Sequence, residues 1–300
     1  MLQRTLTGAV ILLFTVAFVL LKQVHALFFD AFVLIVMYAS ILEISNAYKT
    51  SNKTANNKVL LFVPALMCLV FNLAKSPYPA LVFNALIAVA FLVTLLTYDI
   101  IVFAYNRKHD LTEKNVSVLN QSLFEKTRVS MLIYAYPLLP LSFMFALNHL
   151  PYEIGYVGII LIFAVSMLTD TFAYFFGFLF GKHKFIPEVS PKKTVEGVVG
   201  GFIGGIIGAL ACYFIFYYTD LFVVLNIAGK TKSIIAFLII GVIGSYINQL
   251  GDLIASALKR KIGIKDYANI FPGHGGFMDR VDGMMFVSTF IYIILTLFFV

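Results

Sequence analysis

The fold class is decided by an uninterrupted apolar stretch at residues 154–180, which reads IGYVGIILIFAVSMLTDTFAYFFGFLF. As an α-helix it is long enough to cross the roughly 30 Å hydrocarbon core of a bilayer, and Asp170 is its one charged residue. Similar continuous runs recur along the chain, whereas a membrane β-barrel would show short alternating segments. The sequence therefore predicts an all-α, polytopic integral membrane protein.

Composition supports this class, because 61% of the residues are hydrophobic and 12% are charged, about half the usual ~25%. The first apolar run lacks a good cleavage site after it, so we expect a retained helix and not a signal peptide. We divide the chain into N-terminal transmembrane helices at 1–150 and a C-terminal catalytic region at 151–300. The nine expected spans are 5–21, 26–44, 59–74, 80–105, 129–147, 154–180, 197–225, 234–258 and 282–300.

The basic residues are distributed unevenly between the two sides that these spans define. With the N-terminus inside, 18 of the 22 Lys and Arg fall on the cytoplasmic side and 4 fall outside. We therefore expect a protein of the cell membrane with its N-terminus and polar loops in the cytoplasm and its C-terminus outside. The net charge of +7 is then loop charge that sets topology, and we expect no nucleic-acid partner. Cys68 and Cys212 lie in apolar runs and are interpreted as packing residues.

Two polar features interrupt the apolar pattern before residue 200. Asp170 lies well inside a span, where a carboxylate is costly; it is a candidate functional residue, although pairing with a buried base for packing alone would also explain it. Residues 190–197 read SPKKTVEG, and Lys192 with Lys193 offers paired charge for a phosphate just before a helix N-terminus. Lysines at a membrane boundary also serve as topology anchors, so both interpretations of this segment stay open.

Glycines recur every four residues in the span that follows, from Gly197 through Gly201 to Gly205. A phosphate-binding loop and a helix-packing stripe both use such spacing. Because these glycines sit in a long apolar helix, we favour close helix packing.

The most informative segment is 251–282, which holds four acids, five bases, a histidine and five glycines. Carboxylates bind magnesium and bases bind phosphate, so the mixture predicts metal-assisted chemistry on a phosphorylated substrate. Asp252, Ser256 and Lys259 or Arg260 share one helix face. We expect Asp252 and Asp279 near one divalent ion, with the bases facing a polyphosphate.

These residues resemble the C-terminal signature of the phosphatidate cytidylyltransferase (CDP-diacylglycerol synthase) family. That signature has the form Ser-x-x-Lys-Arg, then Lys-Asp, then Pro-Gly-His-Gly-Gly-x-x-Asp-Arg-x-Asp. The match extends to Asp170-x-x-Ala173-Tyr174 and to residues 190–197, and it covers about 170–282. This chain supplies, in register, Ser256, Lys259, Arg260, Lys265, Asp266, Pro272, Gly273, His274, Gly275, Gly276, Asp279, Arg280 and Asp282.

The resemblance implies a nucleotidyltransferase of phospholipid biosynthesis, in which CTP and phosphatidic acid give CDP-diacylglycerol and pyrophosphate. It implies Mg²⁺ held by Asp252 and Asp279, allows a second cation, and favours a homodimer in the lipid bilayer. The catalytic residues would be Asp252, Asp279, Lys259 and Arg260. The substrate-binding residues would be Ser190, Lys192, Lys193, Thr194, Ser256, His274 and Arg280. The supporting residues would be Asp170, Glu196, Asp266 and Asp282.

The chain departs from the family pattern at Ala255, at Tyr267-Ala268 and at Gly283. None of these removes an expected metal carboxylate, although Ala255 leaves a catalytically inactive homologue as an alternative. A CTP-dependent lipid-alcohol kinase is a second alternative, and its products would be a phosphorylated lipid and CDP. A transporter using Asp170 and Asp252 as ion sites is a third, but it leaves the ordered basic and glycine motifs unexplained. The Asp-Gly start of a CDP-alcohol phosphotransferase motif fails after residue 283.

Overall fold

A computed structural model describes residues 2–73, 80–108, 113–219, 230–271, 273 and 275–299. Helices dominate these residues, which confirms the predicted all-α membrane class. The first half contains α1 (Leu2–Leu21), α2 (Ala26–Thr50), α3 (Asn57–Leu60), α4 (Phe62–Leu73), α5 (Ala80–Lys108), α6 (Glu113–Ile133), the π-helical turn η1 (Tyr134–Leu138) and α7 (Leu139–Asn148). The second half contains α8 (Tyr152–Phe180), β1 (Lys184–Ile186), β2 (Ser190–Thr194), α9 (Val195–Tyr217), α10 (Lys230–Ile262), α11 (Met278–Val281) and α12 (Met284–Phe299).

Every predicted span coincides with a helix in the part of the chain that the structure describes. Six of these helical segments are long and apolar enough to cross a bilayer, and three more are apolar but shorter. The shorter ones are Gly8–Leu21, Asn57–Leu73 and Met284–Leu297. The chain is therefore a membrane protein, while nine as the number of crossings and the division at residue 150 stay predictions. The end of the predicted span 197–225 lies outside the described residues from position 220 onward.

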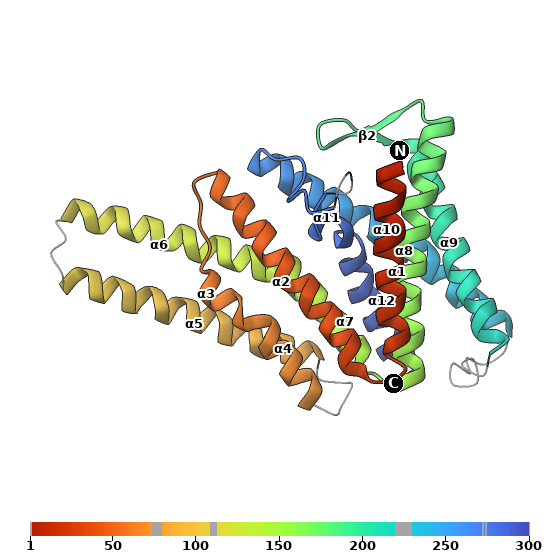
Figure 1. Cartoon of the computed structure of the whole chain (residues 1–300), viewed down its shortest axis with the longest axis horizontal. Helices are drawn as coiled ribbons and strands as arrows, with labels where there is room; N and C mark the ends of the chain where they lie inside the picture. The colour runs from red at the N-terminus through yellow and green to blue at the C-terminus, as the bar shows by residue number, and fades with distance from the viewer. Residues whose placement is uncertain are drawn as a thin grey trace.

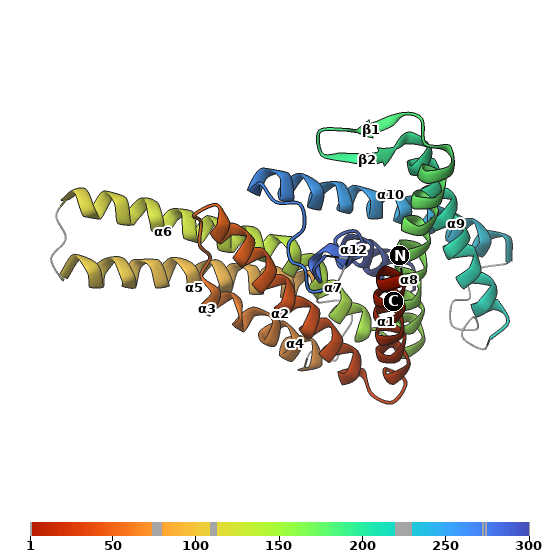
Figure 2. The ribbon, with the colours of Figure 1, turned by 45° about the horizontal axis from the view of Figure 1, so that its top comes forward.

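The C-terminal helices form the part of the bundle that matters for the site. Helix α8 packs along α9, α9 packs along α10, and α12 contacts α7, α8 and α10. The strands β1 and β2 form an antiparallel hairpin that lies over α10 in both ribbon views (Figures 1 and 2). The α5–α6 pair extends away from this group (Figure 1).

The glycines of α9 explain how closely these helices approach. A Cβ atom added at Gly204 would meet the backbone of Leu168 on α8, and one at Gly205 would meet Ser245 and Gly241 on α10. The stripe thus has two faces, one for each neighbouring helix, and the packing interpretation of these glycines is confirmed.

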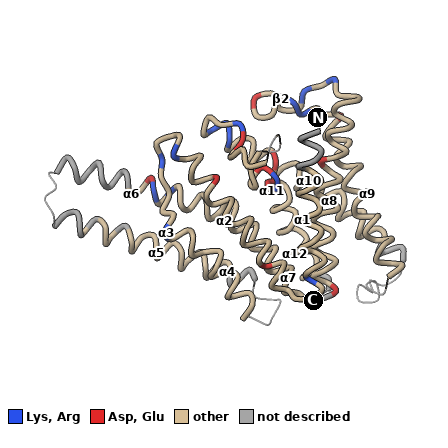
Figure 3. The backbone as a smooth tube through the Cα atoms, in the orientation of Figure 1, with Lys and Arg blue, Asp and Glu red and all other residues tan. Residues whose placement is uncertain are grey.

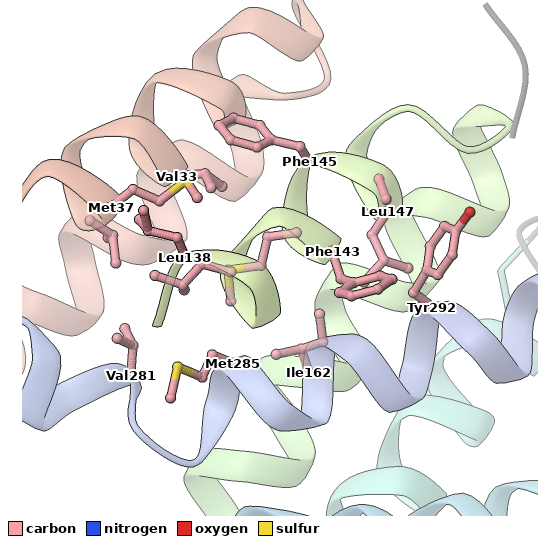
Figure 4. Packing of buried hydrophobic residues seen from close by; sticks show 14 of the residues in the cluster. Val33, Met37, Leu138, Phe143, Phe145, Leu147, Ile162, Val281, Met285 and Tyr292 are labelled. Atoms are coloured by element: carbon pink, nitrogen blue, oxygen red, sulfur yellow. The ribbon is translucent and has the colours of Figure 1, made fainter. Parts of the chain in front are cut away.

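One apolar core joins the two halves of the chain, as Figure 4 shows. Its side chains come from α2, from the η1–α7 segment, from α8 and from the α11–α12 region. The labelled members are Val33, Met37, Leu138, Phe143, Phe145, Leu147, Ile162, Val281, Met285 and Tyr292. The segment that carries Asp279 and Asp282 is therefore supported by N-terminal as well as C-terminal helices.

Charged residues gather at one end of this bundle. Figure 3 shows Lys, Arg, Asp and Glu around the hairpin, the end of α10 and α11. The first turn of α1 lies toward that end and α12 finishes at the opposite end (Figure 1). This separation of charge is the arrangement that the distribution of Lys and Arg predicts.

Candidate active site

The β1–β2 hairpin is fixed to the start of α9 by side chains that the sequence motif contains. Thr194 is the N-cap of α9, where its hydroxyl accepts a 3.1 Å hydrogen bond from the Gly197 amide. Glu196 contacts His183, with 2.7 Å between Oε1 and the ring Nδ1. Both side chains thus hold local structure. The predicted role of Thr194 in substrate binding and that of Glu196 as a supporting residue stay predictions.

From β2, Lys193 reaches across to the face of α10 that carries Asp252. Its Nζ lies 2.7 Å from Oδ2 of Asp252 and also donates to the Gln249 carbonyl at 3.4 Å. Ser256 lies one turn further along α10 and donates to the other oxygen of Asp252 at 3.4 Å. The shared helix face of Asp252 and Ser256 is therefore confirmed. The Asp252 side chain is 36% exposed, so it is accessible to a ligand.

A second ion pair joins the end of α10 to the following loop. Lys259 Nζ lies 2.8 Å from Oδ1 of Asp279, and both side chains are buried. The other Asp279 oxygen, Oδ2, accepts the amides of Tyr267 at 3.0 Å and Gly276 at 2.9 Å. Gly275 lies at φ +80°, a left-handed conformation that glycine adopts readily, directly before the Gly276 amide. Asp279 thus holds the loop through Oδ2 and the end of α10 through Oδ1.

Three carboxylates from different elements interact electrostatically: Asp170 on α8, Asp252 on α10, and Asp282 between α11 and α12. Burial, followed by the negative charge of Asp252, raises the pKa of Asp282 well above its usual range. Asp170 adds to this shift, while Lys259 and Arg280 oppose it. Asp170 accepts a 2.7 Å hydrogen bond from Asn248 on α10. We call these three acids, Asp170, Asp252 and Asp282, the carboxylate cluster.

The remaining predicted residues surround this cluster at the surface. Arg260 is exposed and donates to the carbonyls of Val189 at 3.3 Å and Ile264 at 3.2 Å, so it joins the hairpin to the end of α10. Ser190 is half-buried, and exposed positions are occupied by Lys192, Asp266 and Arg280. His274 lies outside the described residues.

The residues present fit a magnesium ion that is shared with substrate phosphates. No group of three or more His, Cys, Asp or Glu side chains in the described residues is close enough to enclose a metal by itself. Mg²⁺ is usually held by one or two carboxylates together with phosphate oxygens and water, and Asp252 and Asp282 are donors of that kind. The buried Oδ1 of Asn248, one turn before Asp252 on α10, has no hydrogen-bond partner among the described residues.

Residues 2–298 match the family described as the cytidylyltransferase family. This chain belongs to that family. It is 38% identical over 181 residues to a phosphatidate cytidylyltransferase of Staphylococcus saprophyticus, and 35% identical over 181 residues to one of Staphylococcus haemolyticus. Each match covers 59% of this chain and 65% of the relative, so the aligned part spans slightly less than two thirds of those proteins. The family resemblance carried by the 170–282 motifs is confirmed.

Two residues near the family motifs escaped the sequence analysis. Asn248 bonds Asp170, and Glu43, a buried side chain of α2, contacts the loop before Asp279. A signal for Glu43 was present, because it is an acid inside the predicted span 26–44, and the same argument singled out Asp170. Asn248 gave no such signal, since a lone amide in a span is also compatible with helix packing.

Proposed function

We propose that this protein is a phosphatidate cytidylyltransferase, which transfers CMP from CTP to phosphatidic acid and releases pyrophosphate. The observation that carries the proposal is the carboxylate cluster, placed beside Lys193, Lys259 and Arg280 at the charged end of a membrane bundle. The family membership and the printed names of the relatives support it.

The chemistry requires two anions to meet. An oxygen of the lipid phosphate attacks the α-phosphorus of CTP, the bond between the α- and β-phosphates breaks, and pyrophosphate takes the electron pair. Positioning and charge neutralisation supply most of the catalysis in such transfers. Lys193 comes from the hairpin and can exchange Asp252 for a phosphate, whereas Lys259 stays paired with Asp279 and adds positive potential from α10. Arg280 adds charge from α11.

Mg²⁺ would supply further neutralisation of phosphate charge when bound at Asp252. For the second carboxylate, the sequence predicts Asp279, whereas the structure also offers Asp282. Asp279 would have to release Lys259 from Oδ1, while Asp282 forms no ion pair among the described residues. Asp252 is therefore the ligand common to both arrangements. We include a second cation in the same proposal.

The proposal also includes the orientation of the protein in the membrane and its assembly into a homodimer. The charged end would face the cytoplasm, where CTP is available, and phosphatidic acid would enter from the bilayer. The apolar faces of α8 and α9 suit a homodimer in the membrane, as the resemblance implies.

The test is an assay of purified protein in detergent with phosphatidic acid, Mg²⁺ and CTP labelled at either the α- or the γ-phosphate. We expect α-label in the lipid product and an equal amount of pyrophosphate. Incorporation of γ-label would identify the lipid-alcohol kinase alternative when a polyprenol replaces phosphatidic acid. Ion flux in proteoliposomes without nucleotide turnover would support the transporter.

A further inference from the structure

Glu43 lies on α2, in the apolar N-terminal half of the chain, and its side chain is 4% exposed. Its two carboxylate oxygens accept hydrogen bonds from consecutive backbone amides of the C-terminal loop. Oε1 accepts the Phe277 amide at 2.8 Å, and Oε2 accepts the Met278 amide at 2.9 Å. These amides lie at the start of α11, where no carbonyl of the same helix can receive them. A carboxylate from a distant helix therefore caps the short helix that carries Asp279.

Gly276, the residue before Phe277, shows how little space remains around the Glu43 carboxylate. A Cβ atom at Gly276 would lie 2.5 Å from both Cδ and Oε1 of Glu43, closer than real Cβ contacts. The amide of the same residue donates to Asp279. Residue 276 is thus held between Glu43 on one side and Asp279 on the other. A side chain at residue 276 would therefore have to displace the Glu43 carboxylate.

The contacts continue from this loop to α10. Asp279 binds the Gly276 amide through Oδ2 and Lys259 through Oδ1. Asp282 follows after one turn of α11. The position of both acids relative to α10 therefore depends on where the backbone of residues 276–278 is held.

A buried carboxylate is an expensive way to fill a core position, because its desolvation must be offset by hydrogen bonds. Apolar side chains would fill the same space at lower cost. The carboxylate instead fixes the orientation of the loop backbone, since its two oxygens accept hydrogen bonds from two adjacent amides. Phosphoryl-group transfer depends on this kind of placement, because misplacing a catalytic group by about 1 Å can cost about 100-fold in rate.

We propose that Glu43 is a positioning residue of the active site, which fixes residues 276–278 and thereby sets Asp279 and Asp282 against α10. The inference rests on the proposed cytidylyltransferase function and adds to it a residue from the N-terminal helices. Glu43 acts through the loop and does not contact the substrates.

The test compares Glu43→Gln with Asp30→Asn in the full-length protein. The Gln side chain keeps the size of Glu but turns an NH₂ group toward one of the two amides. Asp30 is the matched control, because it is also a carboxylate of α2, is 1% exposed, and accepts side-chain hydrogen bonds from Asn72 and Asn148. Its partners come from α4 and the end of α7, away from the 275–282 loop.

Two quantities are measured at equal folded fraction: kcat with CTP and phosphatidic acid, and hydrogen exchange of the Phe277 and Met278 amides. For Glu43→Gln we expect kcat to fall about 10- to 100-fold and the exchange of these amides to accelerate at least about tenfold. Asp30→Asn should lower thermal stability while leaving both quantities within about twofold of wild type. Gly276→Ala should reproduce the kcat defect, and adding Glu43→Gln to it should cause little further loss.

The inference is overturned if Glu43→Gln keeps wild-type kcat. It is also overturned if both variants lower kcat by the same factor without a change in amide exchange, since that outcome describes general destabilisation. If wild-type protein fails to convert phosphatidic acid, the proposed function fails instead. In that case accelerated exchange in Glu43→Gln alone still supports the positioning contact, and unchanged exchange refutes it.

Discussion

Lys193 and Lys259 each hold one oxygen of an aspartate, and the two ion pairs differ in burial. The Lys193–Asp252 pair is partly exposed, whereas Lys259 and Asp279 have side chains that are 10% and 3% exposed. A buried pair adds little net stability because desolvation offsets the attraction, but removing one partner leaves a costly unpaired charge. The buried pair therefore maintains the shape of the site. A bound ligand can displace the contact between Lys193 and Asp252, because that pair is partly exposed.

Replacing Asp252 with Asn tests the metal assignment at the residue scale. The amide removes the charge that would bind Mg²⁺ and keeps the shape of the side chain. We expect kcat/KM to fall by more than about 100-fold, since even changes next to metal ligands cost 10- to 100-fold. The Mg²⁺ concentration for half-maximal activity should rise. Activity and Mg²⁺ dependence equal to wild type would remove Asp252 from the site.

Asp279→Asn and Asp282→Asn separate the two candidates for the second carboxylate. Asp279→Asn leaves Lys259 unpaired in a buried position, so the free energy of unfolding should decrease by about 3 kcal/mol. Asp282→Asn relieves repulsion from Asp252 and should not destabilise the protein. Thermal unfolding and Mg²⁺-dependent activity are measured for both.

We expect Asp282→Asn to be stable and to lose activity about 10- to 100-fold, as for a residue that takes part in binding the ion. If Asp282→Asn is fully active while Asp279→Asn is folded and inactive, the ligand is Asp279, as the sequence predicts.

At the scale of elements, a polar cluster joins the helix ends at the side of the bundle opposite the carboxylate cluster. Lys22, just after α1, donates to the Asn148 carbonyl at 2.9 Å and to Oδ1 of the same residue at 2.6 Å. Asn148 donates in turn to Asp30 at 2.8 Å, and Asp30 also contacts His149 at 3.0 Å. The cluster connects the α1–α2 turn to the α7–α8 turn and thereby holds these helix ends together.

The buried lysine of this cluster predicts a pH dependence of stability. Burial, partly offset by Asp30, lowers the pKa of Lys22 from 10.5 to about 8. Between pH 8 and 10.5 the unfolded chain binds more protons at this residue than the folded chain, so stability rises with pH across that window. The gain is roughly 2–3 kcal/mol.

Lys22→Met removes the titrating group and should flatten this rise. The measurement is thermal unfolding in detergent from pH 7.5 to pH 10 for wild type and variant. We expect the wild-type Tm to increase relative to that of Lys22→Met as pH rises. Parallel curves, or a wild-type Tm that falls relative to the variant, would contradict the assignment.

At the scale of the whole molecule, one charged end and one weakly charged end predict the orientation in the membrane (Figure 3). The test places single cysteines at Lys184 in the hairpin and at Val24 in the α1–α2 turn, both of which are exposed. The background carries Cys68→Ala and Cys212→Ala. In intact cells an impermeant maleimide should label Val24→Cys, whereas Lys184→Cys should react after lysis only. The reverse pattern would invert the proposed topology.

The helices of this molecule were predictable because the length and composition of each apolar run indicate that it lies in lipid. A run such as 154–180 needs no partner to indicate a helix in lipid, since the backbone must satisfy its own hydrogen bonds there. The glycine stripe of α9 was also readable, because small residues at helical spacing have one main structural use. Helix lengths were less predictable, and three of the expected spans correspond to shorter helices.

The candidate site also has features that local sequence predicts and features that only tertiary contacts decide. The sequence by itself determined the membrane fold class, the family, and the order of the acidic, basic and glycine motifs, because these depend on composition and local spacing. The tertiary structure alone decided that Asp279 binds two loop amides and Lys259, that Asp282 interacts electrostatically with Asp252, and that Glu43 caps α11. Such contacts join segments up to 235 residues apart, and no local pattern encodes which distant side chain fills the space beside a glycine.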